Sequence, residues 1–282
     1  MSVAVVRWAA VLVALVSLLA PRAASATPPL VVKDTVVKRG PAVRPRDYGH
    51  SLFVVAPEVG IGSRHFDYTQ KVSPDLRSYR LSAAPIVGIK AEVYPFAYTS
   101  SAVASAVGIV GEYARSAGLD SSLSDGSKVG TDWSNADIAL RVRIPIRARA
   151  VVGARVGYGR LAFTYGDAGT VSPELPGVGY DYVRAGADAR IAVWRFALYA
   201  NFDYLAVQKA GAVADRFPRP SVGGIDAGVG AGFTISEHFE ARTGVRYQRF
   251  FYDFQSKPTD RVIAGGALDE LGRWDTSLAF IY

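Results

Sequence analysis

Ionisable side chains recur at alternate positions between apolar residues, and their types suit mutual ion pairing. The eight acids of this kind are Glu58, Glu92, Glu112, Asp137, Asp188, Asp203, Asp226 and Glu240. The eight bases are Lys90, Arg141, Arg143, Arg155, Arg184, Arg190, Arg242 and Arg246. Buried charges persist when they are paired. We therefore expect these sixteen residues to share one interior and to fill it as a salt-bridged core, or alternatively to line a narrow pore with an arginine-rich anion path.

Residues that could carry catalysis are scattered. The three histidines lie next to the first predicted strand (His50), in a loop (His65) and in a turn (His238), so we interpret them as surface residues rather than ligands. The sequence contains neither Asp-x-Asp nor Asp-x-His. Ser124-Asp125-Gly126 lacks the glycine that precedes the serine in a nucleophile elbow, and it reads as a turn. These observations predict no enzyme activity, no metal site and no cofactor.

Three glycines alternate at Gly228, Gly230 and Gly232. A phosphate-binding loop would need a helix directly afterwards, and no helical pattern follows. Glycines at alternate positions on the inner face of a barrel can instead make room for large side chains on its neighbours or permit curvature. We expect this second role.

The elements that must position the charged residues are strands. From about residue 49 to the end, apolar residues recur with period 2, and we find no apolar 3.6-residue period long enough to cover a sheet. The ten predicted strands span 53–61, 81–93, 103–113, 138–146, 152–158, 183–191, 196–204, 225–235, 241–247 and 272–282. Long connections alternate with short ones at Pro95, Arg147, Trp194 and Ser236. This pattern predicts an antiparallel up-and-down sheet.

Alternation does not by itself say which face points inward, since a soluble sandwich or a lipocalin-like barrel also alternates. Two features favour charges inside and apolar residues outside. The apolar faces hold Ala, Val, Leu and Ile over ~5 alternating positions, which is about the span of a tilted membrane strand. Aromatic residues gather near the predicted strand ends, as in the girdles of membrane barrels. They are Tyr94, Phe96, Tyr98, Tyr158, Trp194, Phe196, Tyr204, Phe250, Phe251, Tyr252 and Trp274.

The final stretch, Gly272–Tyr282, places Trp274, Leu278 and Phe280 on one face and Arg273 on the other. Such an apolar strand at a chain end would invite aggregation unless it pairs with the first strand and closes a barrel. This ending resembles the terminal strand of bacterial outer-membrane β-barrel proteins, although their usual last residue is Phe. The resemblance implies an all-β transmembrane antiparallel barrel over 49–282, recognition of the last strand by the barrel assembly machinery, and an outer-membrane location.

The N-terminal segment is typical of an exported protein. Residues 1–26 combine Arg7, an apolar run too short to span a bilayer of ~30 Å, and small residues ending at Ala26, which predicts a cleaved signal peptide. Residues 27–48 are rich in proline and basic residues, and we interpret them as a flexible periplasmic tail. A periplasmic arm or a partial plug of the barrel is the alternative.

Composition limits the partners. The chain has no cysteine, which excludes a lipoprotein anchor and thiolate metal sites. The formal net charge is +7, but the bases are not clustered with stacking aromatics, so we expect no nucleic acid. Outer-membrane lipid and the phosphates of lipopolysaccharide are the more sensible partners for exposed bases. No residue pattern identifies an extracellular ligand.

These features predict a structural or surface-interaction scaffold that presents loops on the cell surface. A small passive pore is the alternative. A membrane-embedded hydrolase is the third and least favoured, because the Asp-x-Asp and Asp-x-His pairs of the omptin surface proteases are missing. The chain resembles those ten-stranded proteases in architecture only.

Overall fold

The computed structural model describes residues 48–122, 128–146, 149–166 and 175–282. The predicted signal peptide, residues 27–47 of the predicted tail, Ser124–Gly126 and Arg147 lie outside the described residues. Among the residues that are described, no helix is long and apolar enough to cross a membrane.

The described chain is built almost wholly of strands. They are β1 (Phe53–Thr69), β2 (Tyr79–Val93), β3 (Val107–Ser116), β4 (Leu119–Ser122), β5 (Lys128–Ile146), β6 (Ala150–Tyr165), β7 (Val178–Val193), β8 (Phe196–Lys209), β9 (Ser221–Thr234), β10 (Phe239–Asp253) and β11 (Gly266–Ile281). Short helical segments lie between some of them. These are η1 (Tyr48–His50), α2 (Ala102–Ala106) and α4 (Ala212–Asp215).

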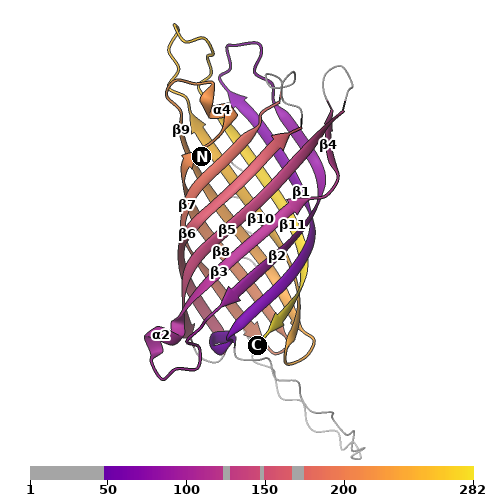
Figure 1. The fold of residues 1–282 in the computed structure, drawn as a ribbon, viewed down its shortest axis with the longest axis vertical. Helices are drawn as coiled ribbons and strands as arrows, with labels where there is room; N and C mark the ends of the chain where they lie inside the picture. The colour runs from indigo at the N-terminus through magenta and orange to yellow at the C-terminus, as the bar shows by residue number, and fades with distance from the viewer. Residues whose placement is uncertain (1–47, 123–127, 147–148, 167–174) are drawn as a thin grey trace, which may run out of the picture. The chain divides into compact units, whose positions relative to one another are not determined.

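The strands form a closed antiparallel barrel (Figure 1). Consecutive strands pair with each other except β3 with β4, and β1 pairs with β11 from Val54–Ile281 to Thr69–Gly266. Both β3 and β4 pair with β5, so together they occupy one position in the wall. The barrel therefore has ten strand positions, and the predicted pairing of the first strand with the last is confirmed.

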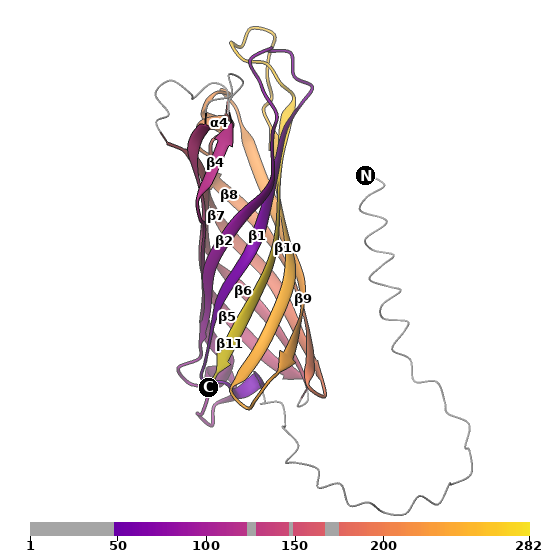
Figure 2. The ribbon, with the colours of Figure 1, turned by 90° about the vertical axis from the view of Figure 1, so that its right-hand side faces the viewer.

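The connections define two ends of the barrel. The first strand begins and the last strand ends at what we call the turn end, where residues 94–106, 147–149, 194–195 and 235–238 connect the strands. At the opposite end, the loop end, the connections span 70–78, 123–127, 166–177, 210–220 and 254–265. Figure 2 shows β1 and β11 meeting side by side at the turn end.

Some predicted boundaries are wrong. Val103 lies in α2 rather than in a strand, and the connection at Pro95–Ser100 continues through this helix, whose first turn is capped by the Ser101 hydroxyl. At the loop end the strands are longer than predicted. Gly62–Thr69 belongs to β1, although its outward residues are polar, because Phe66 and Tyr68 are buried in the interior.

Side chains alternate between the two faces as predicted for most of each strand. Leu140 is 57% exposed on the outer face, while the next residue, Arg141, is 5% exposed inside. In the last strand Trp274 is 54% exposed and Arg273 is 8% exposed. An apolar outside with a charged inside is the reverse of a soluble barrel, and it suits a wall that faces lipid.

Aromatic side chains border the apolar outer face. Near the turn end, Phe53 stacks on Tyr282 at 5.4 Å between ring centroids, and Phe196 contacts Phe233 at 5.2 Å. Nearer the loop end, Tyr158 and Trp274 are exposed. Three predicted girdle residues are instead buried inside the barrel. They are Tyr94, which directly follows β2, and Phe250 and Tyr252, which point inward from β10.

Candidate functional site: the barrel interior

All sixteen predicted charged residues are buried or half-buried, and fifteen of them make ion pairs with another charged residue of the interior. The sixteenth, Arg143, donates hydrogen bonds to the Ser51 carbonyl at 2.7 Å and to the Ser51 hydroxyl at 3.0 Å. Its guanidinium carbon lies 3.4 Å from the centroid of the Tyr94 ring. The segment just before β1 is thus tied to the wall at the turn end.

Two clusters lie nearest the turn end. Arg141 donates to Glu92 through Nη1 at 2.9 Å and to Asp188 through Nε at 2.9 Å. In the second cluster one carboxylate, Glu240, accepts from Arg190 at 2.7 Å and from Arg242 at 2.8 Å. Two bases therefore share this acid.

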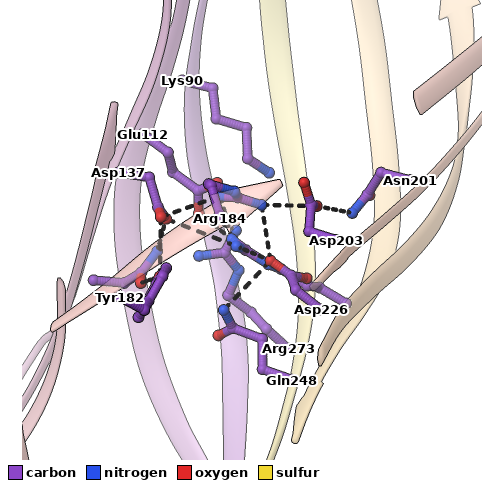
Figure 3. Close-up of polar contacts among 12 residues, drawn as sticks. Lys90, Glu112, Asp137, Tyr182, Arg184, Asn201, Asp203, Asp226, Gln248 and Arg273 are labelled. Carbon is purple, nitrogen blue, oxygen red and sulfur yellow. Dashed lines mark hydrogen bonds and ion pairs between the residues drawn. The ribbon is translucent and has the colours of Figure 1, made fainter. Parts of the chain in front are cut away.

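The central cluster spans the interior from β5 to β10 (Figure 3). Asp226 accepts from Arg184 at 3.1 Å and from Arg246 Nε at 2.9 Å. Arg184 also lies 3.0 Å from Asp137 and 2.9 Å from Asp203. Arg246 also donates to Glu112 at 2.7 Å. Each of the two arginines therefore has more than one acidic partner, and loss of one acid leaves others in reach.

Sequence reasoning missed two members of the network on the last strand. Arg273 donates to Glu112 at 2.6 Å, and its Nη2 lies 3.3 Å from Glu58. Lys90 lies 2.8 Å from Glu58 and 3.5 Å from Asp275. The alternation of Gly272–Tyr282 already placed Arg273 and Asp275 opposite Trp274, so the signal for both residues was present.

Glycines make room for these side chains. A Cβ at Gly228 would lie 2.5 Å from Asn201 Oδ1, and one at Gly232 would lie 2.7 Å from the Tyr199 hydroxyl. A Cβ at Gly159 would lie 2.4 Å from the Tyr182 ring. Gly228 and Gly232 thus have the predicted role. A Cβ at Gly230 would meet only neighbouring backbone, with the Thr243 carbonyl at 2.7 Å.

A cavity of about 250 Å³ lies within the network, lined by Arg155, Tyr199, Asn201 and Arg242 among others. A cavity of this size has room for several water molecules. The charged half of the interior could therefore be hydrated by water in this cavity.

The loop-side half of the interior has a different chemistry. Arg64 and Asp269 form a fully buried bidentate pair, with Nε–Oδ1 and Nη2–Oδ2 distances of 2.8 Å. The Arg64 guanidinium carbon lies 4.3 Å from the centroid of the Phe163 ring. Asp269 also accepts from the Tyr180 hydroxyl at 2.6 Å. We call the buried rings of Phe66, Phe163, Tyr180, Phe250 and Tyr252 the aromatic layer.

The loop end is covered by residues of the connections. Leu76, Leu175, Val213 and Phe217 are buried there, and Phe217 stacks on Phe254 at 3.5 Å between centroids. Leu76, Val213, Phe217 and Phe254 join the aromatic layer in one apolar cluster. Sequence reasoning missed this cluster, because most of its residues fall in stretches predicted as loops or as a girdle.

Alternation reverses its polarity along β1. Near the turn end Val59 and Ile61 point outward and Glu58 points inward. Toward the loop end His65 faces outward while Phe66 is buried. The wall thus has apolar residues outside and charged residues inside where it faces lipid. Toward the loop end it has polar residues outside and apolar residues inside, as in a soluble barrel.

The histidines form no shared site in the described chain. His65 Nδ1 lies 3.9 Å from the Glu270 carboxylate on the outer face. The His238 ring stacks near the Phe280 ring, with 6.0 Å between centroids, and His50 is in η1. Among the described residues no group of three or more His, Cys, Asp or Glu side chains could hold a metal ion.

No protein-family model and no curated protein matches the sequence. Solved structures that align include the outer membrane protease OmpT from Escherichia coli, at 10% identity over 82% of this chain and 96% of that chain, with a TM-score of 0.49. Neisserial surface protein A aligns at 10% identity over 82% and 98%, with a TM-score of 0.35. The outer membrane protein AlkL aligns at 11% over 89% and 97%, with a TM-score of 0.35.

These structural similarities are too low to support a conclusion, so the fold is assigned from the features of this chain. Its strands close from β1 to β11, its outer face is apolar and its interior is charged. The described chain therefore has the fold of an outer-membrane β-barrel.

Proposed function

We propose that this protein is an outer-membrane barrel that conducts no solutes and serves as a rigid scaffold for the surface at its loop end. In this proposal the loop end faces the cell exterior and the turn end faces the periplasm, because single-chain barrels of this membrane carry their longer loops outside. The outer-membrane lipid and lipopolysaccharide would contact the apolar face, and the barrel assembly machinery would act on β11.

One observation carries the proposal, namely that the aromatic layer fills the interior on the loop side. A solute would have to pass Phe163, Tyr180 and Phe250, each of which is 0% exposed. The Arg64–Asp269 pair crosses the same level and joins β1 to β11. Barrels of about eight strands are just filled by side chains, and ten positions are little wider.

The cavity among the charged residues supports the second candidate, a small passive pore. Its arginines would favour anions. However, Arg141, Arg184, Arg190 and Arg246 are each held by a carboxylate. A hydrolase is a weaker candidate, since neither His65 nor His238 faces the interior cavity. The scaffold therefore remains the proposal.

Recordings of the refolded full chain in planar lipid bilayers test it. We expect no current steps above the bare bilayer. A variant with Phe163→Ala and Phe250→Ala, which removes two rings of the aromatic layer, is expected to admit ions if this layer is the barrier. Stable steps of uniform size from the unaltered protein would refute the scaffold and support the pore.

A further inference from the structure

The cavity among the charged residues has more bases than acids on its surface. Seven of its lining residues are basic and five are acidic. The eight acids and eight bases predicted for the interior balance, but three of those acids, Asp203, Asp226 and Glu240, are buried and do not line the cavity. They lie behind the arginines that they hold. A small solute in the cavity would therefore meet a positive surface.

The acids that do line the cavity are already paired. They are Glu92, Glu112, Asp137, Asp188 and Asp275, each within 3.2 Å of an arginine nitrogen. Their negative charge is compensated by these contacts. What the cavity attracts is therefore decided by lining bases whose carboxylates are buried behind them.

Arg155 is such a base, and it has a donor to spare. From β6 it binds Asp203 through Nε at 2.7 Å and through Nη2, which uses one edge of the guanidinium. Its Nη1 makes no hydrogen bond to the part of the chain that the structure describes. The side chain is 18% exposed and lines the cavity. Arginine donors in this fixed geometry suit the oxygens of phosphate and carboxylate groups.

Asn201 places a neutral donor beside Arg155. Its Nδ2 lies 3.5 Å from Asp203 Oδ2, which is long for a hydrogen bond (Figure 3). Asn201 is the inward residue before Asp203 on β8, and it lines the cavity. The amide and the guanidinium thus meet at one carboxylate, and each has a donor that a ligand in the cavity can use.

Glycines leave the wall next to these donors bare. Gly230 on β9 is paired in register with Gly244 on β10 and with Tyr199 on β8. Both glycines line the cavity, so no side chain fills the space in front of them. Arg242 also lines the cavity from β10, with its guanidinium carbon 5.2 Å from the centroid of the Tyr199 ring. We call the hollow between Arg155, Asn201, Gly230, Gly244 and Arg242 the anion pocket.

We propose that the anion pocket binds a small oxyanion of the phosphate class. Arg155 would donate through Nη1 and Asn201 through Nδ2, while Arg242 adds positive charge from β10. A cavity with room for several water molecules also has room for an ion of five heavy atoms. The donors are already held in place, which lowers the cost of binding. The proposal adds a binding site to the scaffold and does not depend on which end of the barrel faces outward.

The test uses the full chain with ¹⁵N-labelled arginine, refolded in detergent micelles in the presence of each anion so that entry into the barrel does not limit binding. The probe is inorganic phosphate, and the readout is the Arg155 Nε–H resonance, which is assigned by its loss in Arg155→Gln. We expect a saturable shift with phosphate and with sulfate, and none with chloride at equal ionic strength. The resonance of Arg160, which is exposed on the outer face of the same strand, should not move.

Asn201→Asp is the most informative variant. It keeps the size of the side chain, and its carboxylate would occupy the Nη1 donors of Arg155. We expect the phosphate affinity, measured by calorimetry, to fall about tenfold or more. Arg155→Gln removes a charged donor and should have a similar effect. The matched control is Arg160→Gln, which removes an equal charge outside the barrel and should leave the affinity unchanged. A heat-shift gel verifies that each variant is folded.

The anion pocket would be rejected by any of three results. They are no saturable shift up to about 10 mM phosphate, which corresponds to very weak binding, an equal shift with chloride, and an unchanged affinity in folded Asn201→Asp. Release of phosphate trapped in vesicles separates this proposal from the scaffold. Leakage with binding intact would keep the pocket and refute the scaffold, whereas a tight barrel that binds no phosphate would reject only the pocket.

Discussion

The two halves of the interior use the same ion-pair chemistry in opposite surroundings. On the loop side one pair, Arg64–Asp269, is embedded among aromatic rings with both side chains 0% exposed. On the turn side the charged clusters surround a cavity, and an acid such as Asp226 has two arginine partners. The first arrangement packs a charged pair into an apolar layer, and the second gives a redundant network with room for water. The difference shows that the number of partners and the access of water decide what a buried charge costs.

The largest effect is expected from Asp269→Ala. It leaves Arg64 without its carboxylate in an apolar layer, and removal of one partner of a buried pair costs ~3–5 kcal/mol. Urea unfolding in lipid vesicles measures the loss. The double variant with Arg64→Met and Asp269→Leu should recover most of it, because apolar side chains of similar size suit the layer. A loss below about 1 kcal/mol for Asp269→Ala would mean that water reaches Arg64.

Asp226→Ala should lower the unfolding free energy by less than Asp269→Ala in the same assay, by about 1–3 kcal/mol. Its partners keep other acids, since Arg184 retains Asp137 and Arg246 retains Glu112. Water in the cavity can also hydrate them. If Asp226→Ala proved more costly than Asp269→Ala, the turn-side network would not be redundant and the contrast between the two halves would fail.

Gly159→Ala probes the boundary between the halves. A new Cβ would meet Asp137 Oδ1 at 2.2 Å and the buried Tyr182 ring at 2.4 Å, so we expect a loss of about 1–3 kcal/mol from overpacking. The control is Gly130→Ala, where nothing lies within 4 Å, and it should be neutral or slightly stabilising. Equal stability of the two variants would show that the side chains around Gly159 can shift to accommodate the added methyl group.

The smallest effect is expected from Arg115→Gln. Arg115 donates to Asp132 at 2.7 Å, close to the Arg64–Asp269 distance, but its side chain is 57% exposed. Exposed ion pairs contribute little to stability. The unfolding free energy should therefore stay close to that of the unaltered protein. A cost that approached that of Asp269→Ala would show that distance rather than burial sets the energy.

The sequence predicts the membrane-facing part of the barrel well, because a single rule governs it. Residues such as Leu140 and Arg141 alternate between lipid and a charged interior, which reveals strand positions and the sixteen inward charges. Arg273 and Asp275 obeyed the same rule but were not included. The exact partners, such as Arg141 with both Glu92 and Asp188, depend on how neighbouring strands are staggered, and period 2 alone does not reveal that stagger.

The loop-side half was not predicted because the rule reverses there. Beyond the lipid the outer face is wet, so Arg64, Phe66 and Tyr68 point inward between polar outward residues, and the stretch reads as a loop. Phe250 and Tyr252 read as girdle residues for the same reason. Asp269 lies in a stretch predicted as loop, so its pairing with Arg64 across β1 and β11 had no signal in the local pattern.

The central claim is that the aromatic layer separates the loop end from the cavity, and thiol labelling tests it most directly. The chain has no cysteine, so Asn201→Cys puts a single thiol at the cavity wall. Lys257→Cys, exposed at the loop end, verifies that vesicles present this end outward. A charged, membrane-impermeant thiol reagent is then added outside. We expect Cys at 257 to react within minutes and Cys at 201 to stay unlabelled until the barrel unfolds. Rapid labelling at 201 from the loop side, in the otherwise unaltered barrel, would contradict a closed interior.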